Sequence, residues 1–216
     1  MPMPSRSRRP DRSTASVPRA AGQVRVIGGR WRNTRLSVPD RPGLRPTSDR
    51  VRETLFNWLL PRLPGATVLD LFAGSGALGL EALSRGAASA TLVERDPGLS
   101  TAIATTLARL EGGQAGRVLN TDALAWLDRP ADQRYDIAFV DPPFADGLWA
   151  QVLDRLPAHL AADAWLYVEA PVGQDCNPGA GWQLHREGST RDVCFALYRR
   201  QGAVTLGSDI QTTESA

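Results

Sequence analysis

The chain has 216 residues, of which 42% are hydrophobic, enough for one sizeable core and about one to one and a half typical domains. It contains no apolar run of about 18 residues and no apolar segment at its N-terminus, which excludes a membrane span and predicts a cytoplasmic protein. Its two cysteines, Cys176 and Cys194, lack the spacing of metal ligands, so we predict no metal site.

The net charge of +2 hides a strong division along the chain. Residues 1–52 carry 13 arginines against three aspartates, a balance of +10, whereas the remainder has a balance of −8. Such segregation is typical of a basic arm that touches a polyanion and a body that does not.

The N-terminal segment divides into a tail and a hairpin. Residues 1–21 have few large apolar side chains, so we expect a disordered basic tail. Residues 23–27 and 30–38 read as two strands joined by a turn at Gly28 and Gly29. Together with the proline-rich connector, residues 22–46 form a predicted extension before the main domain.

Arginines and one tryptophan are interleaved in this extension and at the start of the following helix, a composition that suits a nucleic-acid surface. A hairpin whose arginines only face solvent would show the same pattern. The candidate contact residues are Arg25, Arg30, Trp31, Arg32, Arg35, Arg45, Thr47 and Arg50.

After the connector, Thr47 or Ser48 is the predicted cap of a helix that ends before Pro61 and Pro64. Its apolar residues recur at helical spacing, and its polar first turn could cover a site. The apolar positions are Val51, Leu55, Trp58 and Leu59.

From residue 67 onward, strand and helix patterns alternate. Strands are predicted at 67–71, 90–94, 117–121, 135–140, 165–169, 182–186 and 193–199, and helices at 77–84, 99–110, 123–127 and 148–160. The alternation predicts an α/β, Rossmann-like, doubly wound, mostly parallel seven-stranded sheet over one domain of residues 47–200. The last two strands form an antiparallel hairpin at the sheet edge, and residues 201–216 form a flexible tail.

A glycine-rich turn follows the first strand of this domain. Gly74 and Gly76 permit positive φ and close approach to a ligand, and with Gly79 they match the G-x-G-x-x-G spacing of dinucleotide sites. Asp70 precedes them and would repel a diphosphate, whereas it would attract the ammonium and sulfonium of S-adenosylmethionine. A plain strand-to-helix turn is the alternative.

Carboxylates follow four of the predicted strands. Asp70, Glu94, Asp122 and Asp141 all fall at strand ends, where ligands bind in such sheets. Any one of them alone could be a helix cap. Together they predict a site for a cation that also carries hydroxyl groups.

The tetrapeptide Asp141-Pro142-Pro143-Phe144 suits chemistry on the exocyclic amine of a nucleobase. The Asp141 carboxylate and the Pro142 carbonyl can hold the two N–H bonds, so that the nitrogen lone pair faces a methyl donor. Phe144 offers a face on which a base removed from its stack can rest. A proline-kinked loop would have the same sequence, and nothing in the motif separates guanine from adenine.

In these motifs, the chain from about Val24 to Tyr198 resembles the RsmD-type 16S rRNA (guanine-966 N2) methyltransferases, which are class I S-adenosylmethionine-dependent enzymes. The most specific stretches are 26–31, 45–57, 70–79 and 140–144. The resemblance implies a methyltransferase sheet and S-adenosyl-L-methionine as cofactor.

Carried over residue by residue, the resemblance implies that Asp70, Gly74 and Gly76 line the methionine part of the cofactor. Glu94 would take the ribose hydroxyls and Asp122 the adenine amine, and Asp141 to Phe144 would hold the target guanine. The remaining implied cofactor contacts are Phe72, Ala73 and Ala123.

The resemblance also implies 16S rRNA in an assembled or assembling small ribosomal subunit as the substrate, with ribosomal proteins nearby. We expect a monomer. Two alternatives stay open from the residues alone: a DNA adenine-N6 methyltransferase, which would use the same tetrapeptide, and a dinucleotide-dependent oxidoreductase, which would share the glycine turn but leave Asp141 to Phe144 unexplained.

Overall fold

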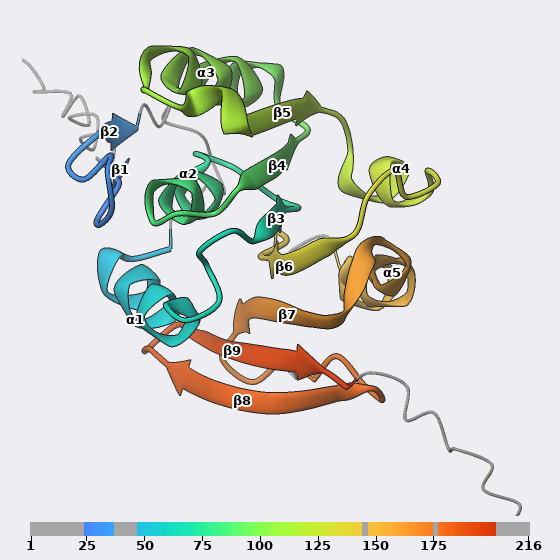
Figure 1. The fold of residues 1–216 in the computed structure, drawn as a ribbon. Helices are drawn as coiled ribbons and strands as arrows, with labels where there is room; N and C mark the ends of the chain where they lie inside the picture. Colours follow the sequence, from blue (N-terminus) through green and yellow to red (C-terminus); the bar gives the residue numbers. More distant parts are fainter. Residues whose placement is uncertain (1–23, 37–46, 144–146, 175–176, 202–216) are drawn as a thin grey trace, which may run out of the picture.

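A seven-stranded sheet forms the centre of the molecule, in the spatial order β5-β4-β3-β6-β7-β9-β8 (Figure 1). The structure, a computed structural model, describes residues 24–36, 47–143, 147–174 and 177–201. The predictions for residues 1–21, for Arg45, for Phe144 and for residues 202–216 lie outside this range.

The sheet strands are β3 (Thr67–Asp70), β4 (Ser89–Glu94), β5 (Gly116–Asn120), β6 (Tyr135–Val140), β7 (Leu160–Pro171), β8 (Trp182–Ser189) and β9 (Val193–Arg200). The first five are parallel to one another, and β9 runs antiparallel to both β7 and β8. The predicted doubly wound, mostly parallel sheet with an antiparallel pair at one edge is therefore confirmed.

Helices cover both faces of the sheet. They are α1 (Asp49–Leu59), α2 (Ala77–Ser84), α3 (Pro97–Arg109), α4 (Ala123–Leu127) and α5 (Trp149–Arg155), with 3-10 turns at Gly113–Ala115 and Leu156–His159. In Figure 1, α1, α2 and α3 lie on one face, and α4 and α5 lie on the other.

Successive side chains of each central strand point to opposite faces of the sheet, so the core has two layers. In β3, Val68 packs with the cluster beneath α1 to α3, whereas Leu69 packs with the cluster beneath α4 and α5. Ile137 and Ala138 divide in the same way in β6. Burial on both faces explains why these strands read as continuous apolar runs.

The α2, α4 and β6 ranges match the predicted ones, but the predicted helix over residues 148–160 is wrong. It ends at Arg155, continues as a 3-10 turn, and gives way at Leu160 to β7. Pro157 lies in that turn, and since proline cannot donate a backbone hydrogen bond it disfavours a continued helix. Leu160 then pairs with Tyr135 of β6.

The N-terminal hairpin is present, but its turn is longer than predicted. Strands β1 (Val24–Arg25) and β2 (Arg35–Leu36) pair antiparallel, and a loop of turns replaces the predicted strand from Arg30. The reason is tertiary, because only Asn33 and Thr34 of this loop bond across the hairpin, to Val26, whereas its beginning bonds to α2. Glu81 of α2 accepts from Ile27 N at 2.6 Å and Gly28 N at 2.8 Å.

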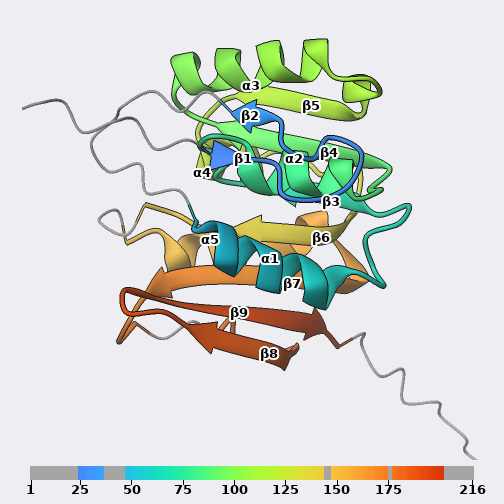
Figure 2. The same cartoon turned by 90° about the vertical axis from the view of Figure 1, so that its left-hand side faces the viewer.

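Further contacts hold the hairpin in place in front of the sheet (Figure 2). Ser84 accepts from Arg30 N through its carbonyl and from Trp31 N through its hydroxyl, each at 2.9 Å. The buried Arg52 of α1 donates to the Arg25 carbonyl at 2.9 Å and lies 3.9 Å from Glu81. The hairpin is thus tied to both α1 and α2.

Candidate active site

A row of carboxylates follows from the order and register of the central strands. Asp70 is the last residue of β3, and Glu94 is the last residue of its neighbour β4. On the other side of β3, Asp141 comes directly after β6. Because parallel strands end at the same edge of a sheet, three of the four predicted acids meet there.

Asp70 is the most deeply placed member of the row, with only 2% of its surface exposed. Burial raises the pKa of Asp70 from 3.8 to about 7, a shift that the Gly79 N–H opposes and the Glu94 carboxylate reinforces. The Gly79 amide donates to Asp70 Oδ2 at 2.9 Å. A cation that approached this carboxylate would stabilise its ionised form.

The glycine turn wraps around these two acids. Gly74 and Gly76 adopt positive φ values of 54° and 76°, and Gly76 is the N-cap of α2. Glu94 accepts from Gly74 N at 2.7 Å and from Asp96 N at 2.7 Å. Burial raises the pKa of Glu94, although these two N–H groups oppose the shift.

Gly79 is required for close packing, whereas Gly74 and Gly76 are required for their positive φ angles. A Cβ added there would lie 2.6 Å from the Leu92 side chain and 3.2 Å from Asp70 Oδ2. The absence of a side chain therefore lets α2 lie close to β4 and lets the Gly79 amide reach Asp70.

Asp122 differs from the other predicted acids because it is exposed and caps a helix. It follows β5 and accepts from Leu124 N at 2.9 Å and Ala125 N at 3.1 Å at the start of α4. The neighbouring Ala123 and the turn residue Ala73 are buried, and Phe72 is half-buried.

Asp141 is half-buried beside the first residues of α1. The Thr47 hydroxyl lies 3.5 Å from Asp141 Oδ2. Burial raises the pKa of Asp141 well above its usual range, the Glu169 and Asp70 carboxylates raise it further, and the Thr47 hydroxyl lowers it. Pro142 is buried and Pro143 is exposed, whereas Phe144 lies outside the described residues.

Glu169 is a site residue that sequence reasoning missed. It belongs to β7, is 5% exposed, and accepts from the Thr47 hydroxyl at 3.2 Å. Its carboxylate raises the pKa of Asp141. The signal in the sequence is a charged residue inside the apolar run of residues 164–170, which no surface role explains.

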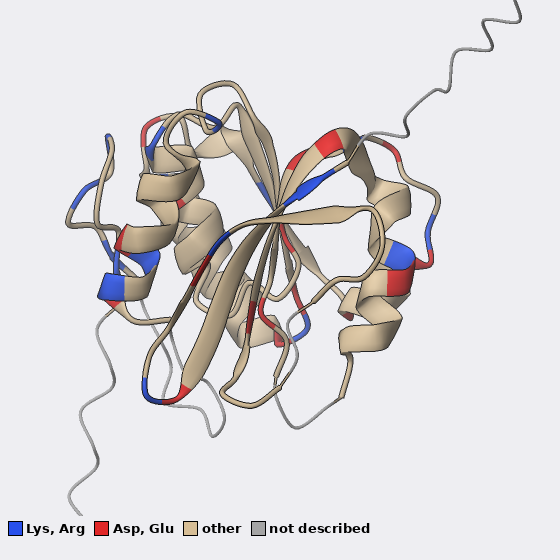
Figure 3. Cartoon of the chain, turned by 90° about the horizontal axis from the view of Figure 1, so that it is seen from below, with Lys and Arg blue, Asp and Glu red and all other residues tan. Residues whose placement is uncertain are grey.

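Only some residues of the predicted nucleic-acid surface are exposed in the structure. Figure 3 shows arginine segments on the side of the molecule that carries α1 and the N-terminal hairpin, and others on the opposite side and at the ends of strands. The exposed members of the predicted set are Arg25, Arg30, Arg32, Arg35 and Arg50.

Trp31 is the correction in this set, because it is 5% exposed and packs in the core instead of facing solvent. Its indole N–H donates to the Glu111 carbonyl at 3.0 Å, and the Arg30 guanidinium lies 4.6 Å from the ring centre. Thr47, another member of the predicted set, lies beside the Asp141 and Glu169 carboxylates.

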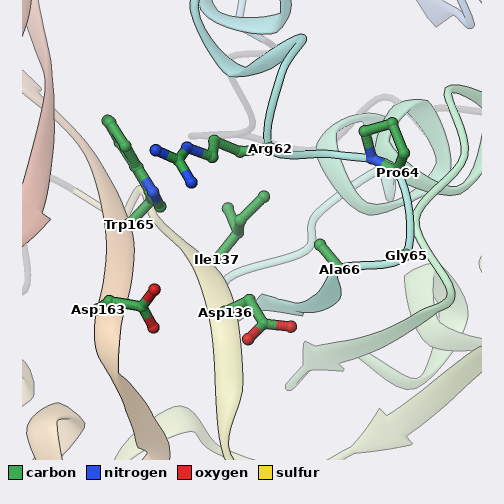
Figure 4. Close-up of a pocket in the computed structure, with 8 residues that line it drawn as sticks. All are labelled: Arg62, Pro64, Gly65, Ala66, Asp136, Ile137, Asp163 and Trp165. Atoms are coloured by element: carbon green, nitrogen blue, oxygen red, sulfur yellow. The ribbon is translucent and has the colours of Figure 1, made fainter.

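A separate pocket lies at the opposite edge of the sheet, where β3, β6 and β7 begin (Figure 4). It is lined by Arg62, Pro64, Gly65, Ala66, Asp136, Ile137, Asp163 and Trp165. The Arg62 guanidinium lies 5.4 Å from the Trp165 ring centre. Asp136 accepts from Thr67 N at 2.8 Å, so this acid already serves the start of β3.

The acid row, which consists of the carboxylates of Asp70, Glu94 and Asp141, fits a small molecule that carries a positive charge and hydroxyl groups. Within the described part of the chain, Asp70 and Asp141 form no ion pair with an arginine, so a bound cation would be the partner that ionises them. No cluster of three or more acids, histidines or cysteines that could hold a metal ion occurs in that part. Nor does it contain a helix long and apolar enough to cross a membrane.

Comparison with known proteins places the chain in a family. The family model described as Conserved hypothetical protein 95 matches residues 24–199. Ribosomal RNA small subunit methyltransferase D of Escherichia coli strain K12 is 51% identical over 185 residues, which cover 84% of this chain and 92% of that protein. The Haemophilus influenzae protein of the same name is 40% identical, with 85% and 97% covered.

Solved structures agree with these relatives. The yhhF protein of Escherichia coli has a TM-score of 0.76 at 49% identity and covers 84% of this chain and 99% of its own. HI0767 of Haemophilus influenzae has a TM-score of 0.71 at 36% identity, with 83% and 99% covered. The chain therefore belongs to the Conserved hypothetical protein 95 family, the RsmD-type methyltransferases that its motifs resemble.

Proposed function

We propose that this protein transfers a methyl group from S-adenosyl-L-methionine to the exocyclic N2 amine of a guanine in small-subunit 16S rRNA. The observation that carries the proposal is the adjacency of Asp70 and Asp141 at the ends of the paired strands β3 and β6. Asp70 precedes the glycine turn, which would hold the methyl donor, and Asp141 begins the motif that would hold the target amine. The donor and the acceptor of the methyl group would therefore lie next to each other.

The residues around the glycine turn would hold the cofactor. Asp70 would take the cationic methionine part next to Gly74 and Gly76, and Glu94 would accept from the ribose hydroxyls in place of the Gly74 amide. Asp122, Ala123, Phe72 and Ala73 would border the adenine end. When bound, S-adenosylmethionine supplies an electrophilic methyl group on a sulfonium.

Asp141 and the Pro142 carbonyl would hold the amine of the target base. An amine that is conjugated with its ring is a poor nucleophile, and two acceptors on its N–H bonds favour the pyramidal form whose lone pair points at the methyl group. The positive charge that develops on nitrogen during transfer is stabilised by the Asp141 carboxylate. Proton loss from the methylated nitrogen follows easily because that nitrogen has become acidic.

The proposed substrate rests on the printed names of the relatives and on charge. The exposed arginines of the hairpin and α1 would contact the phosphates of the RNA backbone, which proteins bind mainly with arginine and lysine side chains. We propose the assembled or assembling small subunit as the physical substrate, neighbouring ribosomal proteins as contacts, a monomer as the active form and the cytoplasm as the location.

Transfer of a labelled methyl group to three substrates tests the function. The substrates are protein-bound small-subunit rRNA from a strain that lacks the modification, the same rRNA without protein, and duplex DNA. We expect label on guanine N2 in rRNA, and the first two substrates show whether ribosomal protein is required. Asp163→Asn, a change at an exposed acid far from the acid row, is the matched control and should retain full activity.

Two results would contradict the proposal. Label on adenine in DNA would assign the protein to the DNA methyltransferases, which use the same tetrapeptide. Absence of label on every substrate, with S-adenosylmethionine at saturating concentration, would contradict the proposed methyl transfer. It would favour the alternative of a dinucleotide-dependent oxidoreductase.

A further inference from the structure

Glu169 lies beside Asp141 for a topological reason. Strands β6 and β7 are parallel and pair Val140 with Val168, so the next residues on the two strands, Asp141 and Glu169, stand level at the sheet edge. The Thr47 hydroxyl touches both, at 3.5 Å from Asp141 Oδ2 and 3.2 Å from Glu169 Oε2. The two carboxylates are therefore close enough together to accept hydrogen bonds from two neighbouring donors of one bound molecule.

The surroundings of Glu169 favour a carboxylate that accepts. The Tyr167 hydroxyl donates to Glu169 Oε2 at 2.9 Å, and the Thr47 hydroxyl donates to the same atom. These contacts fix the orientation of the Glu169 carboxyl group, with Oε2 turned toward the two hydroxyls. Because Glu169 is 5% exposed, a mismatched partner there would not be rescued by water.

We propose that Glu169 reads the target base as guanine by accepting its N1–H while Asp141 holds the neighbouring N2 amine. This inference rests on the proposed function and deepens it. On the Watson-Crick edge of guanine the N1–H and the N2 amine are adjacent donors, which matches two carboxylates side by side. In adenine the atom next to the amine is N1 with a bare lone pair, which a carboxylate would repel.

Thr47 and Tyr167 are positioning residues in this scheme, because they act on the base only through Glu169. Thr47 immediately precedes Ser48, whose hydroxyl caps α1 by accepting from Val51 N at 3.3 Å. The start of α1 is thereby held against the ends of β6 and β7, which couples base recognition to the helix that follows the N-terminal extension.

The test compares two bases at the methylated position. Small subunits are reconstituted around 16S rRNA that carries either guanine or 2,6-diaminopurine there; the analogue keeps the N2 amine but has a lone pair in place of N1–H and an amine in place of O6, so the Glu169→Gln comparison assigns the effect of N1. We expect the unaltered protein to prefer guanine by about 10²-fold in kcat/KM, because a site built around a hydrogen bond rejects the analogue that lacks it. In Glu169→Gln, whose amide can also donate, the preference should fall to within about tenfold.

The outcomes separate this inference from the proposed function. Transfer to guanine with an equal rate on the analogue would overturn the role of Glu169 while leaving methyl transfer to N2 intact, and so would a Glu169→Gln variant that slows both substrates equally. Absence of transfer to guanine by the unaltered protein would overturn the proposed function itself. The preference of the unaltered protein needs no variant, so a Glu169→Gln chain that failed to fold would not remove the test. Asp163→Asn, on the same strand β7, is the control and should keep the full preference.

Discussion

At the scale of single residues, Asp70 links the stability of the protein to pH. Burial raises its pKa from 3.8 to about 7, so the folded protein binds this proton more tightly than the unfolded chain does. Its contribution to stability is therefore complete below about pH 4 and is lost as pH rises to about 7. Asn at this position stays neutral and can still accept the Gly79 N–H.

We therefore expect Asp70→Asn to stabilise the cofactor-free protein progressively between about pH 4 and pH 8, by up to about 4 kcal/mol. Urea unfolding at a series of pH values measures the difference. Asp163→Asn, the exposed control, should follow the unaltered protein, and an Asp70→Asn curve parallel to that of the unaltered protein would show that Asp70 is not destabilised by ionisation.

Asp141 offers the sharpest test of a chemical role at this scale. Removal of the carboxylate in Asp141→Ala takes away an acceptor that acts on the developing positive charge. We expect methyl transfer to fall by about 10² to 10³, roughly 3 to 4 kcal/mol, with cofactor affinity nearly unchanged. Single-turnover transfer and calorimetric titration separate the two quantities. Loss of cofactor affinity with normal turnover at saturation would place Asp141 in the cofactor site instead.

At the scale of elements, one buried carboxylate joins the hairpin to two helices. Glu81 is fully buried, accepts from Ile27 N, Gly28 N and Arg85 Nε, and lies 3.9 Å from the buried Arg52. Glu81→Ala would remove the acceptor for two hairpin amides and the carboxylate that pairs with Arg85 at 2.6 Å, whereas Arg52 would keep its 2.6 Å ion pair with Asp49.

For Glu81→Ala we expect a loss of about 3 to 5 kcal/mol in unfolding free energy, typical of breaking one side of a buried ion pair. Hydrogen exchange at the Ile27 and Gly28 amides should accelerate more than exchange in β3. Glu111→Ala is the control, since this exposed residue contacts Trp31 through its backbone carbonyl only. Uniform acceleration across the domain would argue that Glu81 does not specifically anchor the hairpin.

At the scale of the whole molecule, charge is divided between the N-terminal 52 residues, at +10, and the acidic remainder. The acid row suits a cationic cofactor, and the basic part suits a polyanion, so the two ligands would be drawn to different regions. The first 21 residues alone contain five arginines and one aspartate. If these arginines contact the RNA backbone, the contribution to binding would be electrostatic and would therefore depend on salt.

We expect a chain that lacks residues 1–21 to bind rRNA more weakly, with a shallower slope of log affinity against log salt, because fewer counterions are released. Binding measured by filter retention at several salt concentrations gives both quantities. A tail of equal length in which the five arginines are replaced by glutamine separates charge from length. Equal affinity and equal slope for all three chains would leave the tail without a role in RNA binding.

Local sequence patterns were enough to predict the doubly wound sheet and the edge at which three of the predicted acids meet. Local patterns carry that information: α4 begins at the Asp122 cap, α2 begins at the glycine turn, and β6 contains the apolar run of residues 137–140 between Asp136 and Asp141. Once strands alternate with helices, the parallel arrangement follows, and with it the common end of the strands.

Only the tertiary structure decided three features, and each depends on contacts between residues far apart in the chain. Glu169 joins Asp141 because β7 pairs with β6 in a register that no local pattern specifies. Trp31 is buried because its part of the hairpin loop bonds to Ser84 of α2, which lies 53 residues further along the chain. Thr47 reaches two carboxylates because α1 crosses to the ends of β6 and β7. Strand and helix propensities act within a few residues, whereas register and docking are set by packing across the whole domain.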